Sequence, residues 1–128
     1  MKSLYFITIF LLISCSRQSL VNSDCRTNCY QIVKNYAKPA LNEKGEIKGR
    51  LFDFADNSPF TSARISIKGI NFEQELKTNE YGDFSIMLNE GHYTIKISSI
   101  GIHELTTRKI LVRKGYSLKI DFMITYEV

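Results

Sequence analysis

Residues 116–126 alternate strictly between large apolar or aromatic side chains and polar ones, and this pattern constrains the fold more than any other part of the chain. Every second residue belongs to the apolar set, in the order Tyr116, Leu118, Ile120, Phe122, Ile124 and Tyr126. A period of two places these side chains on one face of a β-strand. The segment therefore predicts a strand with one buried face.

Similar patterns recur about every ten residues from Gly45 onward, separated by turn residues such as Gly, Asn and Pro. They predict further strands over residues 47–53, 63–69, 72–78, 83–88, 92–98 and 105–112. Strands with one apolar face are stable when two sheets stack those faces together. The sequence thus predicts an all-β fold, a seven-stranded antiparallel β-sandwich over residues 45–128.

The turn before the predicted strand 83–88 supports this prediction. Gly82 stands where a hairpin needs a positive φ, and the Asn79 side chain can bond the backbone of its own turn. We expect residues 72–88 to form a hairpin around this turn.

Several spaced motifs resemble one known family. They read Gly45-x-Ile47-x-Gly49-x-Leu51-x-Asp53, Pro59-Phe60-x-x-Ala63-x-Ile65-x-Ile67-x-Gly69, Thr78-Asn79-x-x-Gly82-x-Phe84-x-Ile86 and Gly91-x-Tyr93-x-Ile95-x-Ile97-Ser98-x-Ile100-Gly101. Together they resemble the carboxypeptidase regulatory-like domain. The resemblance implies a transthyretin-like or prealbumin-like sandwich without catalytic residues of its own. Members of that family occur as accessory domains of metallocarboxypeptidases, on outer-membrane receptors and alone on lipoproteins.

The N-terminus resembles a bacterial lipoprotein signal with its lipobox. Lys2 precedes an apolar run over residues 4–13, and Leu12-Ile13-Ser14-Cys15 follows the lipobox order. The run is too short to span a bilayer, which needs about 20 apolar residues. We predict that residues 1–14 are a signal peptide and that Cys15 is lipidated. Ordinary secretory cleavage without lipid, or a buried N-terminal element of a cytosolic domain, are the alternatives.

Residues 15–44 are predicted to form a lipidated tether of about 30 residues that contains a short helix. From Cys25 to Ala37, apolar residues recur every three to four positions, Ser23 or Asp24 can cap the start, and Pro39 follows the end. This spacing predicts an amphipathic helix over residues 25–37.

Cys25 and Cys29 face oxidising conditions if the chain is exported, so a disulfide, within the chain or between chains, is one interpretation. Free buried thiols are another. A metal site is disfavoured because a closed zinc site needs four ligands, and the two histidines, His92 and His103, lie far away in sequence. Acidic turn residues such as Asp53, Asp56 and Asp83 lack a calcium-loop spacing. We therefore expect neither metal nor cofactor.

The chain carries a formal net charge of +4, with Lys and Arg scattered between acidic residues. No run of four or more basic residues occurs, which argues against a nucleic-acid groove or a polybasic membrane patch. We expect no nucleic-acid partner. A weakly basic face that attracts anionic headgroups or polysaccharide is kept as an alternative.

Motifs for catalysis are sparse. Ser98-Ser99-Ile100-Gly101 lacks the Gly-x-Ser-x-Gly elbow of serine hydrolases. His92 and His103 are the only imidazoles, and they can act together only if they lie within hydrogen-bond reach of shared groups. A small envelope enzyme that uses these two histidines is therefore kept as an alternative.

The sequence favours a non-catalytic, lipid-anchored binding or structural module of the cell envelope, on the periplasmic face of the outer membrane. Its partners are expected to be the membrane, through the lipid on Cys15, and an envelope protein or glycan. An accessory subunit of an outer-membrane receptor or transporter is a further alternative. The candidate binding patch consists of aromatic residues that break the strand alternation or lie in turns, namely Phe52, Phe54, Phe60 and Tyr81.

Overall fold

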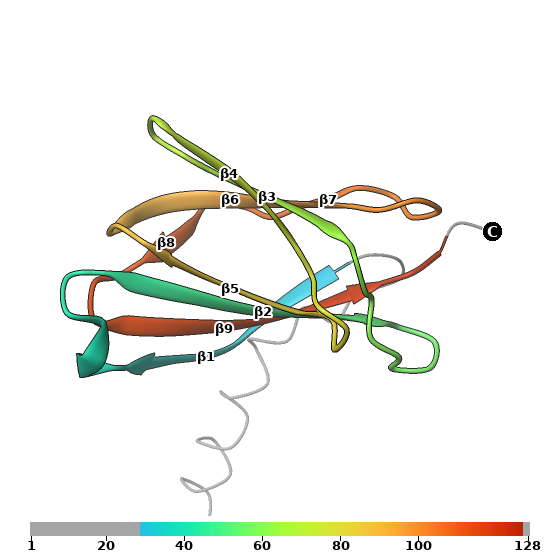
Figure 1. Ribbon diagram of the computed structural model, residues 1–128, viewed down its shortest axis with the longest axis horizontal. Helices are drawn as coiled ribbons and strands as arrows, with labels where there is room; N and C mark the ends of the chain where they lie inside the picture. Colours follow the sequence, from blue (N-terminus) through green and yellow to red (C-terminus); the bar gives the residue numbers. More distant parts are fainter. Residues whose placement is uncertain (1–28, 127–128) are drawn as a thin grey trace, which may run out of the picture.

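The computed structural model describes residues 29–126, which form two β-sheets packed face to face (Figure 1). The strands in this part of the chain are β1 (Cys29–Ala37), β2 (Gly45–Asp53), β3 (Arg64–Gly69), β4 (Phe72–Lys77), β5 (Asp83–Leu88), β6 (Gly91–Ser98), β7 (Leu105–Thr106), β8 (Ile110–Val112) and β9 (Tyr116–Ile124). A 3-10 helix, η3 (Pro39–Leu41), lies between β1 and β2. Within residues 29–126, no helix has the length and apolar character needed to cross a membrane.

The first sheet has the strand order β1-β9-β2-β5, and the second has the order β4-β3-β6-β7, with β8 also pairing with β6. Every pair is antiparallel except β2 and β9, which run parallel. The predicted β-sandwich is confirmed. The described residues hold nine strands rather than seven, because β1 joins the first sheet and the predicted strand 105–112 is divided.

The core lies between the two sheets and is built from alternating strand positions. In the second sheet, Ile65 pairs with Ile97 and Ile67 pairs with Ile95, and all four side chains are fully buried. On β9 the buried side chains are the predicted Leu118, Ile120, Phe122 and Ile124. Each such side chain contributes about 1.5–3 kcal/mol when buried, so the alternation decides which strand face points inward.

Residues 29–37 form the edge strand β1, so the predicted helix over residues 25–37 is wrong for this stretch. β1 pairs with β9 from Cys29 opposite Met123 to Ala37 opposite Tyr116, with a bulge between Ile32 and Lys34. Two physical reasons explain the difference. β-Branched and aromatic residues, which β1 contains, favour strands, and β9 supplies hydrogen bonds to β1 whereas a short isolated helix is marginal in water.

The sandwich therefore includes residues 29–44, which the sequence assigned to the tether. The predicted tether to Cys15 would then consist of residues 16–28 alone. The predicted signal peptide, Cys15 and Cys25 lie outside the described residues.

The predicted strand 105–112 is interrupted at Thr107. The Thr107 hydroxyl accepts the Ile95 N–H at 2.9 Å, and the Thr107 N–H donates to the Ile95 carbonyl at 2.9 Å. A side chain thus takes the place of a backbone partner of β6. As a result, β7 pairs with one part of β6 and β8 with another.

The turn before β5 has the predicted chemistry but a different position in the fold. The Asn79 side-chain oxygen accepts the N–H groups of Tyr81 and Asp83 at 2.9 and 3.0 Å, and Gly82 has a φ of 76°. A Cβ on Gly82 would lie 2.4 Å from the Leu51 carbonyl oxygen, so the close approach also requires glycine. The turn carries the chain from β4 in the second sheet to β5 in the first, and the expected hairpin over residues 72–88 is wrong.

Candidate functional site

The predicted aromatic patch is only partly at the surface. Phe60 is buried, with its ring centroid 4.8 Å from that of Tyr126, so its inclusion in an exposed patch is wrong. Phe54 is 49% exposed and Tyr81 is 65% exposed, whereas Phe52 is half-buried.

Phe52, Phe54 and Tyr81 lie at the same end of the first sheet. Phe52 is opposite Met123 of β9, and the Phe54 N–H donates to the Ile124 carbonyl at 2.9 Å. Tyr81 precedes Gly82, whose carbonyl accepts the Leu51 N–H at the end of β2. The structure therefore gathers three of the four predicted aromatics around the end of β2.

Cys29 is nearly buried at the start of β1 and is disulfide-bonded. Cys15 and Cys25 lie outside the described residues. The pairing of Cys29 with Cys25 stays a prediction.

The two histidines lie far apart. His92 is the second residue of β6 and His103 follows the far end of that strand, which rises about 3.3 Å per residue. β6 separates them by roughly 20 Å, which is far beyond hydrogen-bond reach. The two histidines therefore cannot act on one reacting group, as the predicted two-histidine site would require.

The acidic turn residues are engaged within their own loops. Asp53 accepts the Ala55 N–H at 2.8 Å, and Asp56 accepts the Ser58 N–H at 3.0 Å. In the part of the chain that the structure describes, no group of three or more His, Cys, Asp or Glu residues is placed to hold a metal ion.

Three lysines form a row across the outer face of the first sheet. Lys34 of β1 is opposite Lys119 of β9, and Lys119 is opposite Lys48 of β2. All three side chains are exposed. Adjacent strands are about 4.8 Å apart, so this basic row spans roughly 10 Å of the surface. Among residues 29–126, no carboxylate lies within 4.0 Å of the Lys34 or Lys119 ammonium group.

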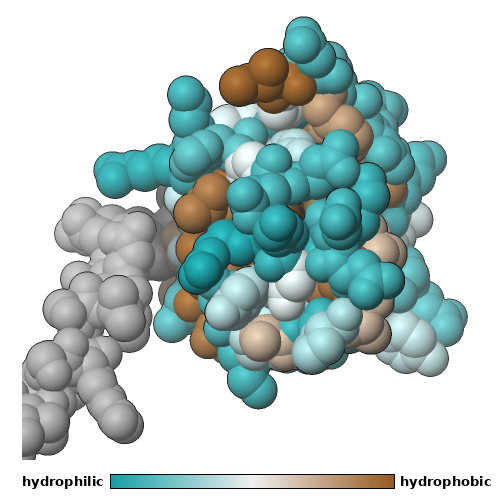
Figure 2. All heavy atoms as spheres, turned by 90° about the vertical axis from the view of Figure 1, so that its left-hand side faces the viewer, coloured by the Kyte–Doolittle hydropathy of each residue, from teal (hydrophilic) through white to brown (hydrophobic). Residues whose placement is uncertain are grey.

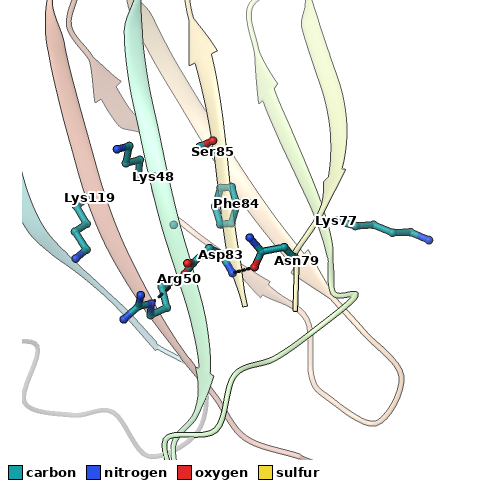
Figure 3. A pocket seen from close by; sticks show the side chains of 9 residues that line it. Lys48, Arg50, Lys77, Asn79, Asp83, Phe84, Ser85 and Lys119 are labelled. Carbon is teal, nitrogen blue, oxygen red and sulfur yellow. Dashed lines mark hydrogen bonds and ion pairs between the residues drawn. The ribbon is translucent and has the colours of Figure 1, made fainter. Parts of the chain in front are cut away.

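A surface hollow of about 540 Å³ adjoins this row. We call it the basic hollow, and its polar or charged lining residues are Lys48, Arg50, Lys77, Asn79, Asp83, Ser85 and Lys119. Figure 3 shows Lys48, Arg50 and Lys119 on one side of the hollow, with Lys77 extending away from them on the other side. Four cations thus line the hollow together with one acid.

That acid, Asp83, already has a partner. Its Oδ1 accepts the Arg50 Nε–H at 3.0 Å, and its backbone N–H donates to Asn79 (Figure 3). Because the Asn79 oxygen is occupied by backbone donors, its amide NH₂ group is the part of the side chain left to bond a ligand. The hollow therefore offers mainly cations and hydrogen-bond donors.

Glu46 precedes Lys48 by two residues on β2, and its side chain bonds to Ser117 of β9. Its Oε1 accepts the buried Ser117 hydroxyl at 2.8 Å and the Lys38 ammonium at 3.3 Å, with Lys48 at 4.0 Å. Burial alone would raise the pKa of Glu46, but the hydrogen bonds from Ser117 and Lys38 and the charges of Lys38 and Lys48 outweigh it. They hold the pKa below its ordinary value.

The sequence did not reveal this basic row, because its lysines are far apart in the chain and come from three different strands. The signal was present in part: Lys48 and Arg50 alternate with Ile47 and Leu51, which marks them as outward-facing. The pairing of β9 with both β1 and β2, which brings Lys34 and Lys119 beside Lys48, was not predictable from that alternation.

Residues 46–125 match the family pattern of the carboxypeptidase regulatory-like domain. Carboxypeptidase D of Rattus norvegicus is 36% identical over 78 residues, which cover 61% of this chain and 6% of the relative. Carboxypeptidase D of Homo sapiens is 31% identical over 78 residues, with the same coverage of the two chains. The chain thus spans about 6% of the length of these curated relatives.

Solved structures with related folds include a suggested carbohydrate-binding protein from Bacteroides uniformis, with a TM-score of 0.53 and 15% identity, covering 62% of this chain and 40% of the other. A 3-chlorocatechol 1,2-dioxygenase from Rhodococcus opacus has a TM-score of 0.55 and 12% identity, covering 66% of this chain and 60% of the other. At such identities the likeness concerns the fold alone.

Proposed function

The chain belongs to the carboxypeptidase regulatory-like domain family, and from this premise we propose that it is a non-catalytic, lipid-anchored binding module of the cell envelope. Its ligand contact is the basic hollow together with the basic row, and its ligand is an acidic polysaccharide. The anchor is a lipid on Cys15, which holds the module at the periplasmic face of the outer membrane.

The observation that carries the proposal is the basic row. Like charges directly opposite each other on adjacent strands destabilise a sheet. Within residues 29–126, the Lys34 and Lys119 ammonium groups have no carboxylate within 4.0 Å, and Lys48 has Glu46 at 4.0 Å. An anionic ligand bound across the row would neutralise this excess of positive charge.

The form of the hollow favours an extended ligand over a small enclosed one. It lies at the surface of the first sheet and is bordered by side chains from different strands. Ser85 and Asn79 add hydroxyl and amide groups beside the cations, which suit a ligand that carries both hydroxyls and negative charges. Polysaccharides with carboxylate or sulfate groups have this chemistry.

The N-terminal sequence supports the anchor. Lys2, the apolar residues 4–13 and the lipobox ending at Cys15 follow the order of a lipoprotein signal. Two or more acyl chains on one residue give stable attachment to a bilayer. A module so attached needs no enzymatic activity to contribute to the envelope, since it can hold a ligand near the membrane.

Mass analysis of the full chain purified from membranes tests the anchor. We expect a mature N-terminus at Cys15 that carries a thioether-linked lipid. We expect the Cys15→Ser variant to leave the membrane fraction, while the control Cys25→Ser stays bound. A mature chain without lipid contradicts the anchor, and co-purification of a stoichiometric receptor supports the accessory-subunit alternative instead.

A pair of matched polymers tests the ligand class. Dextran sulfate and neutral dextran share one backbone and differ in charge. We expect the purified full chain to bind dextran sulfate and not dextran, with affinity that falls as salt is added. Equal binding of both polymers, or binding of neither, contradicts an acidic-polysaccharide ligand. Retention by anionic vesicles without retention by the polymer favours a lipid headgroup as the ligand.

A further inference from the structure

One end of the sandwich exposes several apolar side chains. β2 and β9 end there and β1 begins there. We call it the apolar end and define it by Phe52, Phe54, Ile100, Met123 and Tyr126. Ile100 is 96% exposed, Tyr126 is 53% exposed and Phe54 is 49% exposed.

The contacts of these residues hold them together at this end. Phe52 is opposite Met123 on the outer face of the first sheet. Tyr126 pairs with Ile102, two residues after Ile100, and a Cβ on Gly101 would lie 3.5 Å from the Tyr126 ring. The apolar end therefore joins the ends of β2 and β9 to the loop that follows β6.

The N-terminal part of the chain meets the sandwich at the same end. Cys29, the first residue of β1, is opposite Met123. Residues 16–28 are all that separates Cys15 from this point. A segment of that length cannot span more than about 50 Å even when fully extended. A lipid on Cys15 would therefore hold the start of β1, at the apolar end, within about 50 Å of the bilayer.

The opposite end has a mixed surface. Figure 2 shows that end facing the viewer. Hydrophilic side chains cover most of it, and hydrophobic groups lie at the top, where the β3–β4 hairpin is, and along the left side. Ile70, in the turn of that hairpin, is 91% exposed. Met87 and Leu111, near the starts of β2 and β6, are also exposed there, at 54% and 48%. Both ends therefore expose apolar side chains, including one strongly exposed isoleucine each, and the N-terminal part of the chain joins the sandwich at the apolar end.

We infer that the apolar end rests in the headgroup layer of the bilayer that holds the Cys15 lipid. Aromatic residues favour this layer, and exposed apolar clusters on small domains mark contact surfaces. The inference rests on the proposed lipid anchor. Asp56 and Glu104, in the neighbouring loops, have exposed carboxylates that would repel anionic headgroups. We therefore expect the contact to form on neutral lipid.

Tryptophan fluorescence tests the inference directly, because the chain contains no Trp. Ile100→Trp and the matched control Ile70→Trp each introduce one fluorophore at an exposed isoleucine. Lipidated full chain is inserted into phosphatidylcholine vesicles with and without brominated acyl chains. A residue at the headgroup boundary lies roughly 5–10 Å deep, so we expect bromine to quench I100W at least about threefold more than I70W.

The outcomes separate the inference from the proposed anchor. Vesicle-bound, lipidated protein with equal quenching of both variants overturns the inference and leaves the anchor intact. A blue-shifted I100W emission that bromine does not quench overturns it in favour of contact with a second copy. Protein that carries no lipid and does not attach to vesicles overturns both. Matching melting temperatures of the two variants confirm that neither substitution disturbs the fold.

Discussion

At the scale of single residues, buried polar side chains complete the hydrogen bonding of strands that end or cross between sheets. The Thr78 hydroxyl accepts the Ala63 N–H at 2.9 Å and donates to the Phe60 carbonyl at 2.8 Å. Thr107 plays the same part for Ile95. A buried backbone group left without a partner is costly, so these threonines contribute to the stability of the sandwich alongside its apolar residues.

Thr78→Val tests this role, because valine keeps the shape of threonine and loses its hydroxyl. Two buried backbone groups lose their partner, so we expect the free energy of unfolding to fall by about 2–3 kcal/mol. Urea denaturation measures the change. The control Thr106→Val, at an exposed position of β7, should change stability by less than about 0.5 kcal/mol. Equal effects of the two substitutions would contradict the assigned role.

Glu46 gives a prediction about pH. Its pKa is lower in the folded chain than its ordinary value, so its charge stabilises the fold above the unfolded pKa, and this contribution is lost as the pH falls through the folded pKa. We expect Glu46→Gln to lower the free energy of unfolding by about 1–2 kcal/mol at pH 7 and by much less at the acid end of the range.

Denaturation of wild type and variant across pH 3 to 7 checks this dependence. Glu73→Gln is the control, because the Glu73 side chain is well exposed and lies 3.8 Å from Lys68; an exposed pair of this kind contributes little. A loss of stability in Glu46→Gln that stays constant over the whole pH range would show that the charge of Glu46 is not its cause.

At the scale of elements, strand alternation was enough to predict most of the sheets. The bounds of β5 match the prediction, and the inward faces of β3, β6 and β9 were identified from their period of two. β1 was missed because its pattern is weak. It is an edge strand with both Ile32 and Val33 about half exposed, and a bulge breaks its alternation. A period of two cannot be detected in a strand that buries little on either face.

The site was harder to predict than the fold. The aromatic residues of the end of β2 were found because they break the alternation, yet Phe60 proved to be buried. The basic row depends on which strands are neighbours, and β9 lies between β1 and β2 although it is last in the chain. Local sequence carries little information about such long-range neighbours.

Amide hydrogen exchange distinguishes the observed strand β1 from the helix that the sequence suggested. An edge strand is bonded to one neighbour only, so alternate amides of residues 29–37 should be protected by their partners on β9. The remaining amides should exchange rapidly. Continuous protection over the whole stretch, as in a helix, would contradict the assignment. Residue-resolved NMR exchange rates provide the measurement.

At the scale of the whole molecule, three features are arranged around one sandwich. The predicted anchor segment meets the fold at Cys29, the apolar end surrounds that point, and the basic hollow lies on the outer face of the first sheet. With β1 part of the sandwich, residues 16–28 alone remain for the predicted tether. We therefore propose a module held close to the membrane, with its ligand surface on the side.

The central claim is that the basic hollow binds an acidic polysaccharide, and calorimetric titration with dextran sulfate tests it most directly. The double variant Lys48→Gln/Lys119→Gln removes two charges from the hollow, and Lys68→Gln/Lys109→Gln removes two charges elsewhere on the surface. We predict that the first raises the Kd at least about tenfold, a change of about 1.4 kcal/mol, and that the second raises it less than about twofold. Equal weakening by the two double variants would contradict the claim, because it would show that net charge, and not the hollow, attracts the polymer.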